Sequence, residues 1–300
     1  MSEMPIYMDH HATTPVDERV LAAMLPYFVT RFGNAASRAH AHGKAAREAV
    51  ELGRAQVAGL VGAKPDEVVF TSGATESDNL AIRGVAQGRL GDGKHIVTAC
   101  TEHRAVLDTC AALERDGWRV TWLDVDSQGL VSPEAVAEAL TDETVLVSMM
   151  LANNEVGVVQ DLGAIGALTA ERGITLHCDA AQGLGYLPFS VDDMNIDLVS
   201  ISAHKMYGPK GIGALYIRDA LRARGIPVAQ MLGGGHEGGF RSGTLNVPGI
   251  VGFGAAAESM KNDGAADAAR LESLRDGLKD RLLTEVEEVR LNGAASPRHP

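Results

Sequence analysis

The sequence has few cysteines and few aromatic residues, and it has no long apolar run. Its 300 residues include three cysteines, Cys100, Cys110 and Cys178, with no Cys-x-x-Cys spacing. A sparse and odd set of this kind excludes a disulfide framework and a zinc site, and it is typical of a reducing compartment. No apolar stretch approaches the eighteen or more residues of a membrane span. We therefore expect a cytoplasmic protein with no membrane partner.

Basic residues are also in short supply. Lys and Arg number 27 against 39 Asp and Glu, so the net charge is −12, and no basic cluster occurs. This balance argues against direct binding of nucleic acid. The N-terminus has neither a basic region nor an apolar region of the kind found in secretory signals. With 45% hydrophobic and 22% charged residues, the chain has the composition of a globular protein.

Apolar runs with strand character alternate with segments of helical periodicity along most of the chain. Seven strands are predicted, at residues 67–70, 95–99, 119–125, 145–151, 175–178, 197–202 and 212–217. Several are unbroken apolar runs, which is typical of strands covered on both faces. The sequence therefore predicts an α/β fold with a mostly parallel seven-stranded sheet wrapped by helices. The connection between the last two strands is too short for a helical crossover, so one edge is expected to be antiparallel.

The pattern changes in the last quarter of the chain. A glycine-rich segment, residues 233–239, predicts a flexible loop, and a long helix is predicted over residues 251–283, followed by a short strand at 288–291. One helix and one strand cannot cover their own apolar face, so the C-terminal region is expected to be an incomplete α+β domain. The predicted domains are a large one over residues 15–255 and a small, partial one formed by residues 1–14 and 256–300.

One lysine stands at the end of a predicted buried strand. Lys205 follows the apolar run 196–201 and precedes a glycine-bounded turn. Desolvation lowers the pKa of an amine, which makes it a nucleophile able to form a Schiff base. Asp179 ends another strand and could pair with a protonated pyridine nitrogen. An isolated strand-end lysine is usually a surface residue, but together the two side chains predict a site for pyridoxal 5'-phosphate (PLP).

The segment after the first predicted strand has the composition of a phosphate-binding loop. Residues 71–77 read Thr-Ser-Gly-Ala-Thr-Glu-Ser and open a helix. Small residues such as Ala74 let the backbone approach an anion, the helix N-terminus supplies free N–H groups, and the Thr75 hydroxyl adds a donor. An ordinary helix cap with a capping-box glutamate is the alternative. Beside the lysine, the loop predicts a phosphate cup completed by Ser202 and His204.

Three further polar side chains follow strand ends. His103 could stack on a cofactor ring or move a proton, although an isolated histidine there is more often structural. Asn154 could bind a carboxylate or the phenolic oxygen of the cofactor, although paired amides are also common in turns. Gln182 could reach the same oxygen. Because ligands bind at the carboxyl ends of the strands in such sheets, we expect these loops to converge.

Eight motifs occur in the order in which one known family has them. They lie at residues 9–15, 32–34, 72–76, 101–103, 153–157, 179–182, 202–205 and 241–244. In these motifs the chain resembles the NifS/IscS group of cysteine desulfurases, which are PLP enzymes of fold type I and belong to the class-V aminotransferases. The resemblance runs from about residue 6 to residue 293, almost the whole chain.

The resemblance implies a role for each catalytic side chain. Lys205 would hold PLP and later move the Cα proton of L-cysteine, and Asp179 would pair with the pyridine nitrogen. His103 would stack on the ring and assist proton transfer. Gln182 and Asn154 would hydrogen-bond the phenolic oxygen or the substrate carboxylate. The expected products are L-alanine and a protein persulfide, whose sulfur passes to an acceptor protein or an iron–sulfur scaffold.

The resemblance also implies how the phosphate of PLP is held. Thr75, Ser202 and His204 would bind it within one subunit, and Thr244 would reach across a homodimer interface to the phosphate of the partner subunit. In the family, the attacking cysteine and the arginine that binds the substrate carboxylate lie beyond the position of residue 300. The chain is therefore expected to be truncated at its C-terminus and to release little sulfur by itself.

The three cysteines that are present are expected to be buried small hydrophobic residues. Cys178 neighbours Asp179 on a strand, so the two side chains point to opposite faces. Cys110 lies within a predicted helix, and Cys100 lies within a predicted strand. Two alternatives to a cysteine desulfurase stay open: a related class-V PLP lyase or aminotransferase for another amino acid, and a PLP-binding dimer without catalytic activity.

Overall fold

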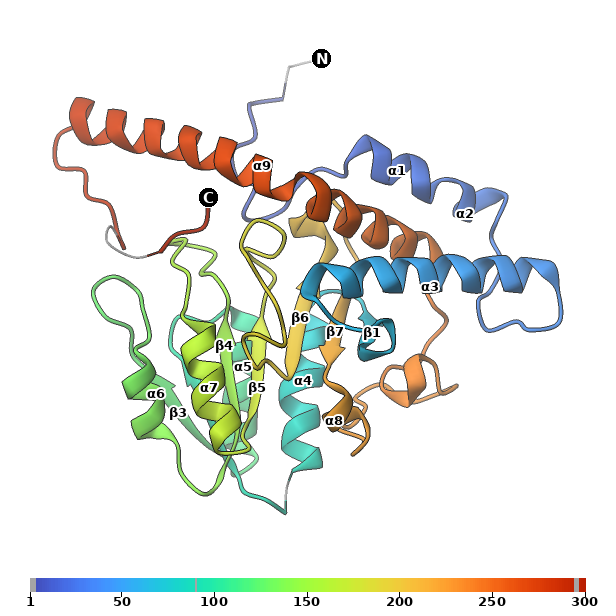
Figure 1. Ribbon diagram of the computed structural model, residues 1–300, viewed down its shortest axis with the longest axis horizontal. Helices are drawn as coiled ribbons and strands as arrows, with labels where there is room; N and C mark the ends of the chain where they lie inside the picture. The colour runs from blue at the N-terminus through green and yellow to red at the C-terminus, as the bar shows by residue number, and fades with distance from the viewer. Residues whose placement is uncertain (1–3, 90, 294–296) are drawn as a thin grey trace.

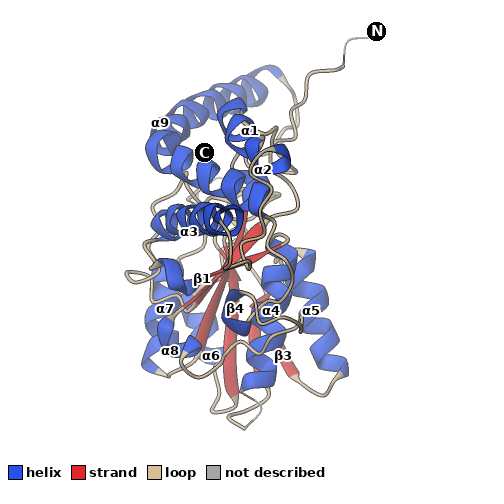
Figure 2. Cartoon of the chain, turned by 90° about the vertical axis from the view of Figure 1, so that its right-hand side faces the viewer, coloured by secondary structure: helices blue, strands red, loops and turns tan. Residues whose placement is uncertain are grey.

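A seven-stranded sheet forms the centre of the molecule (Figures 1 and 2). The computed structural model describes residues 4–89, 91–293 and 297–300. The strand order is β1-β7-β6-β5-β4-β2-β3, and all seven predicted strands are confirmed. Their bounds are Val68–Thr71 (β1), His95–Ala99 (β2), Arg119–Leu123 (β3), Thr144–Met150 (β4), Thr175–Asp179 (β5), Leu198–Ser202 (β6) and Gly213–Ile217 (β7).

The sheet is mixed, with its antiparallel part at one edge. Strands β2 to β6 pair in parallel, whereas β7 pairs antiparallel with both β6 and β1. The predicted antiparallel edge is therefore confirmed. Because β2, β4, β5 and β6 are parallel, their carboxyl ends meet at one edge of the sheet, where the loops that carry the candidate residues begin.

Helices cover both faces of the sheet, as Figure 2 shows for α4 and α5 on one side and α6 and α7 on the other. Alternate strand residues face the two layers: Ile96 packs with α4 and α5, and Val97 packs with the opposite core. The helices are Glu18–Met24 (α1), Pro26–Val29 (α2), Ala41–Val61 (α3), Ala74–Gly88 (α4), Arg104–Arg115 (α5), Pro133–Ala139 (α6), Leu162–Glu171 (α7), Asp219–Arg222 (α8) and Val247–Glu285 (α9).

Helices α3 and α9 pack closely against each other at a pair of glycines. A Cβ on Gly254 would lie 2.6 Å from the Cα of Gly53, so a side chain at this position would push the two helices apart. The first half of α9 is buried here through Ile250 and Phe253. Close backbone approach of this kind lets two long helices close the core on the side of the sheet away from α4.

The last part of the chain differs from the prediction in one element. Residues 288–291 form no strand, because they are exposed and lie beyond α9 with no sheet edge beside them. Helix α9 runs for 39 residues and includes residue 255, where the domain boundary was placed. Its buried positions end at Gly264, after which Leu274 and Leu278 are exposed. The division into a large and a small domain stays a prediction.

Within the described ranges, no helix combines the length and the apolar character that crossing a membrane requires.

Candidate active site

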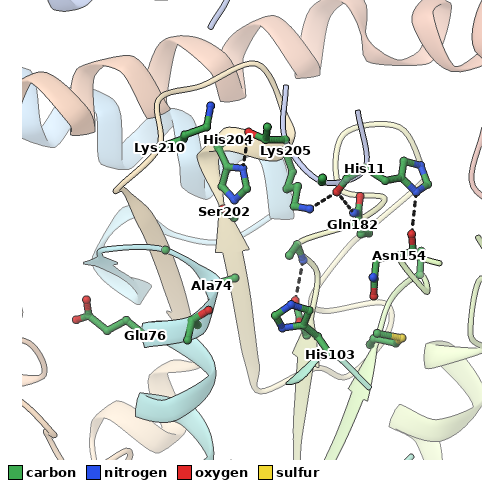
Figure 3. A pocket seen from close by; sticks show the side chains of 18 of the residues that line it. His11, Ala74, Glu76, His103, Asn154, Gln182, Ser202, His204, Lys205 and Lys210 are labelled. Carbon is green, nitrogen blue, oxygen red and sulfur yellow. Dashed lines mark hydrogen bonds between the residues drawn. The ribbon is translucent and has the colours of Figure 1, made fainter. Parts of the chain in front are cut away.

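A cavity of about 830 Å³ opens at the carboxyl ends of the parallel strands (Figure 3). It brings together nine of the ten residues that the sequence nominates for the site. These are Ala74, Thr75, His103, Asn154, Asp179, Gln182, Ser202, His204 and Lys205. They come from five separate loops, so the predicted convergence at one sheet edge is confirmed.

Lys205 lines the cavity from the short turn Ala203–Lys205 that follows β6 (Figure 3). Its Nζ donates a hydrogen bond to the backbone oxygen of His11. Burial lowers the pKa of Lys205, and the charges of Asp179, Asp9 and Glu155 oppose that shift only in part. No carboxylate in the described part of the chain forms an ion pair with this amine. The side chain therefore has the properties of a nucleophilic amine.

Asp179 is the last residue of β5 and is 5% exposed. One carboxylate oxygen accepts a hydrogen bond from the backbone N–H of Ala181 at 2.9 Å. Burial raises the pKa of Asp179, and that hydrogen bond and the charges of His103 and Lys205 offset the rise only in part. A buried carboxylate that lines a cavity is best satisfied by a cationic ligand group. Its neighbour Cys178 packs in the core on the other face, as predicted.

The donor-rich end of the cavity is formed by the first turn of α4 and the end of β6. Gly73 is the N-cap of α4 with a φ of 150°, and a Cβ on Gly213 would lie only 2.6 Å from its Cα. Ser202 is 2% exposed, and its Oγ has no hydrogen-bond partner among the described residues. Free backbone N–H groups and an unpaired buried hydroxyl suit an anion.

His204 and Glu76 flank this donor-rich end (Figure 3). His204 Nδ1 lies 3.1 Å from Thr13 Oγ1, and burial lowers the pKa of the ring, with a further decrease from Lys205. A Glu76 oxygen accepts a hydrogen bond from the Ser72 N–H at 2.7 Å. The glutamate of the capping alternative is thus present, and it does not prevent the same loop from lining the cavity.

The opposite wall carries the amides and an imidazole. His103 caps α5, with Nδ1 accepting a hydrogen bond from the Ala105 N–H at 3.1 Å, so the neutral ring carries its proton on Nε2. Gln182 Nε2 donates to the His11 oxygen at 2.8 Å. Asn154 donates to Glu155 Oε1 at 2.8 Å. Each of these side chains keeps part of its hydrogen-bonding capacity for a ligand.

An N-terminal segment, residues 9–14, closes one side of the site. The Thr14 hydroxyl donates to the His204 oxygen at 3.0 Å and accepts from the Tyr207 N–H at 2.9 Å. His11 contributes its backbone oxygen to Lys205 and its ring Nδ1 to the Asn154 oxygen, at 3.1 Å. No role for these residues was predictable from local patterns, because their partners His204 and Lys205 are almost two hundred positions away. The motif at 9–15 was the available signal.

Two acidic residues near Asp179 were also missed. Asp78 on α4 is fully buried, and Glu102, which precedes His103, is 5% exposed. Burial raises the pKa of both carboxyl groups well above the usual range, and the Asp179 charge raises both further. Burial therefore favours the neutral form of both carboxyl groups, and of the three acidic residues Asp179 is the one that lines the cavity.

Two predicted features lie elsewhere. Thr244 is exposed and does not line this cavity, so its proposed role in a partner subunit stays a prediction. Cys100 is exposed, and the prediction that it is buried within a strand is wrong, because β2 ends at Ala99 and Cys100 begins the following turn. Cys110 and Cys178 are buried as predicted, and burial raises the pKa of Cys110 to about 12.

The residues of the cavity fit PLP. Ser202 and the α4 N-terminus offer unsatisfied donors for a phosphate, and Asp179 offers a buried carboxylate for a ring nitrogen. Lys205 lies in the same cavity with a lowered pKa, as an imine-forming amine requires. Phosphate donors, a pyridinium partner and a reactive lysine in one cavity define a PLP enzyme of the α/β class.

Comparisons with known proteins agree with this class. A model of the family described as aminotransferase class-V matches residues 6–300. A curated relative named cysteine desulfurase IscS, from Anaeromyxobacter sp. (strain Fw109-5), is 58% identical over 99% of this chain and 73% of its own length. The cysteine desulfurase IscS of Neisseria meningitidis serogroup C is 53% identical over 99% of this chain and 72% of its own length.

Solved structures give the same result. A structure named NifS-like protein has a TM-score of 0.89 and 40% identity, and the match covers 94% of this chain and 76% of that one. A structure of SspA in complex with cysteine has a TM-score of 0.81 and 46% identity, over 84% of this chain and 72% of that one. The chain therefore belongs to the class-V aminotransferase family, within its group of cysteine desulfurases.

Proposed function

We propose that this protein is a PLP-dependent cysteine desulfurase, which removes sulfur from L-cysteine and leaves L-alanine. The observation that carries the proposal is the amine of Lys205, which lies half-buried with a lowered pKa in the same cavity as Asp179 and the unpaired hydroxyl of Ser202. The relatives named cysteine desulfurase and the similar structure that holds cysteine support L-cysteine as the substrate.

Each part of the cavity has a task in this reaction. When bound, PLP supplies an electron sink for the Cα of the amino acid. Lys205 would hold the cofactor covalently and would move the proton of the substrate Cα. Asp179 would pair with the ring nitrogen and favour its protonated form. The α4 N-terminus, Ser202 and His204 would hold the phosphate.

The opposite wall orients the substrate. His103 presents its Nε2 side to the cavity, since Nδ1 is engaged with the backbone of α5, and it can exchange a proton there. The amides of Asn154 and Gln182 are placed to donate to a carboxylate or to a phenolic oxygen. The hydrogen bond from Gln182 to the His11 oxygen fixes the orientation of that amide before a ligand arrives.

We further propose a homodimer in which Thr244 serves the partner subunit, a cytoplasmic location, and transfer of the sulfur to an acceptor protein or iron–sulfur scaffold. The exposed position of Thr244, outside the cavity of its own subunit, supports the first of these. Mixing Lys205→Ala with Thr244→Ala subunits should restore one complete site per hybrid dimer. A monomer that binds PLP normally at micromolar concentration would contradict the shared site.

The central experiment tests where PLP attaches. The purified protein should be yellow, and borohydride followed by peptide mapping should find the cofactor on Lys205. Lys210 also lines the cavity and is the matched control, so Lys210→Ala should keep the adduct and Lys205→Ala should lose it. An adduct on Lys210, or no adduct, would refute the assignment. A change in the absorbance of the bound cofactor on addition of L-cysteine then tests the substrate.

A further inference from the structure

The glycine-rich segment before residue 244 contains a buried acidic side chain. The side chain of Glu237 is 1% exposed and forms a two-pronged ion pair with Arg54 of α3, at 2.7 and 2.8 Å. It also accepts a hydrogen bond from the Phe70 N–H at 2.7 Å. Charge-assisted, bidentate pairs of this kind are strong and directional. The predicted flexible loop is therefore anchored to the sheet at this point.

The Arg54–Glu237 ion pair occupies the position that a neighbouring strand would take beside β1. β1 is at the edge of the sheet, so the backbone groups on its outer side lack a strand partner. Arg54 Nη1 donates to the Val68 oxygen at 2.8 Å, while the Glu237 carboxylate accepts from Phe70 two residues later. The ion pair thus satisfies one outward C=O and one outward N–H of the strand that leads into the phosphate loop.

A second ion pair follows four residues after the first. Arg241 Nε and Nη2 contact the two oxygens of Glu76 at 2.7 and 3.2 Å, and both side chains are about four-fifths buried. Glu76 belongs to the first turn of α4 and also accepts from the Ser72 N–H. Arg241 therefore binds the α4 end of the loop that follows β1, and Glu237 binds the β1 end of the same loop.

The two contacts bracket the loop that lines the donor-rich end of the cavity. Residues 237–241 contact β1 at Phe70 and α4 at Glu76, and residues 71–75 lie between these two points. The segment touches the loop from outside the cavity: Glu237 and Arg241 do not line it, whereas Glu76 does. A backbone cradle for an anion works best when its geometry is fixed before the anion arrives.

Arg241 also has an electrostatic role, because it offsets the negative charge of Glu76. A carboxylate that borders the donor-rich end repels a phosphate bound there. Burial raises the pKa of Glu76, but the hydrogen bonds from Arg241 and Ser72 outweigh burial, so the pKa is lowered and the group stays ionised. Among the ion pairs of the described residues, the one with Arg241 is the pair that offsets this negative charge at the first turn of α4.

We propose that residues 237–241 form a brace that positions the phosphate-binding loop 71–75, with Arg241 also neutralising Glu76 beside the phosphate. The proposal rests on the proposed function, since it assumes that this loop receives the phosphate of PLP. Glu237 and Arg241 are positioning residues, because they act through the loop and not on the cofactor.

The test is titration of the apoprotein with PLP, read by absorbance, with circular dichroism as a check on folding. Arg241→Met keeps the length of the side chain but leaves Glu76 uncompensated, and we expect PLP to bind about ten-fold more weakly. Glu76→Gln keeps the capping hydrogen bond, because glutamine serves at this position, and removes the charge. It should bind PLP at least as tightly as the unmodified protein.

A double variant distinguishes the effect of an uncompensated charge on Glu76 from a general disruption of the fold. Glu76→Gln combined with Arg241→Met should recover binding to within about three-fold of the unmodified protein, since no unpaired charge remains. The exposed ion pair Arg281–Glu285 provides a control, and Arg281→Met should not change binding. Binding by Arg241→Met equal to that of the unmodified protein would overturn the brace. A double variant as weak as Arg241→Met would overturn the neutralising role.

The failure of the brace can be told apart from the failure of the proposed function. If the unmodified protein takes up no PLP on Lys205, the proposed function fails and the titration has no baseline. If it takes up PLP and inorganic phosphate competes, the loop is the phosphate site. Equal competition by phosphate in the unmodified protein and in Arg241→Met would then refute the brace alone.

Discussion

The two ends of the cavity differ in charge and in the way they are built. The donor-rich end consists of one contiguous loop, 71–75, together with Ser202 and His204, and it offers N–H and O–H groups. The acidic end consists of Asp179, with Asp78 and Glu102 buried nearby. One end suits an anion and the other suits a cation, so the cavity is complementary to a ligand that has a phosphate at one side and a protonated ring nitrogen at the other.

The largest effect is expected from the acidic end. Asp179→Asn removes the carboxylate that pairs with the ring nitrogen, and turnover should fall by at least about a hundred-fold, the scale on which lost electrostatic stabilisation acts. The cofactor should still bind, because the phosphate end is untouched. Exchange of the Cα proton of L-cysteine with deuterated water needs no attacking thiol and measures turnover, and the absorbance of the bound cofactor measures binding.

Asp78→Asn is the matched control for that substitution. Burial raises the pKa of Asp78 well above the usual range and the nearby Asp179 charge raises it further, so an amide resembles the neutral form that burial favours. We expect turnover within about three-fold of the unmodified protein and an unchanged absorbance spectrum. If both substitutions reduce turnover equally, the acidic end acts as a unit and the contrast between an ionised and a neutral aspartate is wrong.

A second prediction concerns the pH dependence of the Lys205 amine, which lies between the two ends of the cavity. Only the neutral amine of Lys205 adds to the aldehyde of PLP, and an unperturbed lysine is neutral in roughly 0.4% of molecules at pH 8. Burial lowers the pKa of Lys205, so the neutral fraction is larger at any pH below that pKa. The rate of PLP capture should therefore rise with pH and level off below pH 10.5.

The charge of Asp179 opposes this shift, which sharpens the prediction. Because Asp179 raises the pKa of Lys205, Asp179→Asn should move the plateau to lower pH. Stopped-flow absorbance at a series of pH values measures both proteins. If the rate of PLP capture levels off near the pKa of a free lysine, the Lys205 amine is solvated. If the plateau moves to higher pH in Asp179→Asn, the Asp179 charge does not raise the pKa of Lys205.

A smaller effect is expected at the donor-rich end. Ser202→Ala removes one hydroxyl among several donors, so PLP affinity should fall about five- to ten-fold, as for the loss of a single ordinary hydrogen bond. Turnover at saturating PLP should change little. Equilibrium titration of the apoprotein measures the affinity, and Ser200→Ala, whose hydroxyl contacts His177 at 2.9 Å, is a control outside the cavity. Equal losses in both variants would point to the sheet and not to the phosphate.

The contrast between the two ends also shows what the sequence could supply. The phosphate loop was predictable because its donors are consecutive and open a helix, and Lys205 and Asp179 were predictable as polar residues at apolar strand ends. Asp78 was hidden inside α4, where an acidic residue looks like part of a solvated face. The Arg54–Glu237 and Arg241–Glu76 pairs join positions more than 160 apart, and only the fold brings them together.

Two predictions about strands were wrong for a similar reason. The strand predicted at 288–291 needed a neighbouring sheet edge, which the described residues do not place beside it. The predicted strand 95–99 has the bounds of β2, but Cys100, which was expected to be buried within that strand, lies one residue beyond its end. Local apolar character sets the length of a predicted strand, whereas pairing with adjacent strands sets its real end.

The smallest expected effect on the site concerns the cysteines. Cys100 is exposed, while Cys110 and Cys178 are buried with raised pKa values, so a brief treatment with iodoacetamide at pH 8 should label Cys100 alone. Mass spectrometry identifies the labelled peptide, and denaturation should expose the other two. Because Cys100 does not line the cavity, Cys100→Ser should leave PLP binding and alanine formation unchanged. If that substitution abolishes sulfide release while PLP stays bound, Cys100 is the thiol that takes sulfur from the substrate, and the exposed turn after β2 must then be counted as part of the active site.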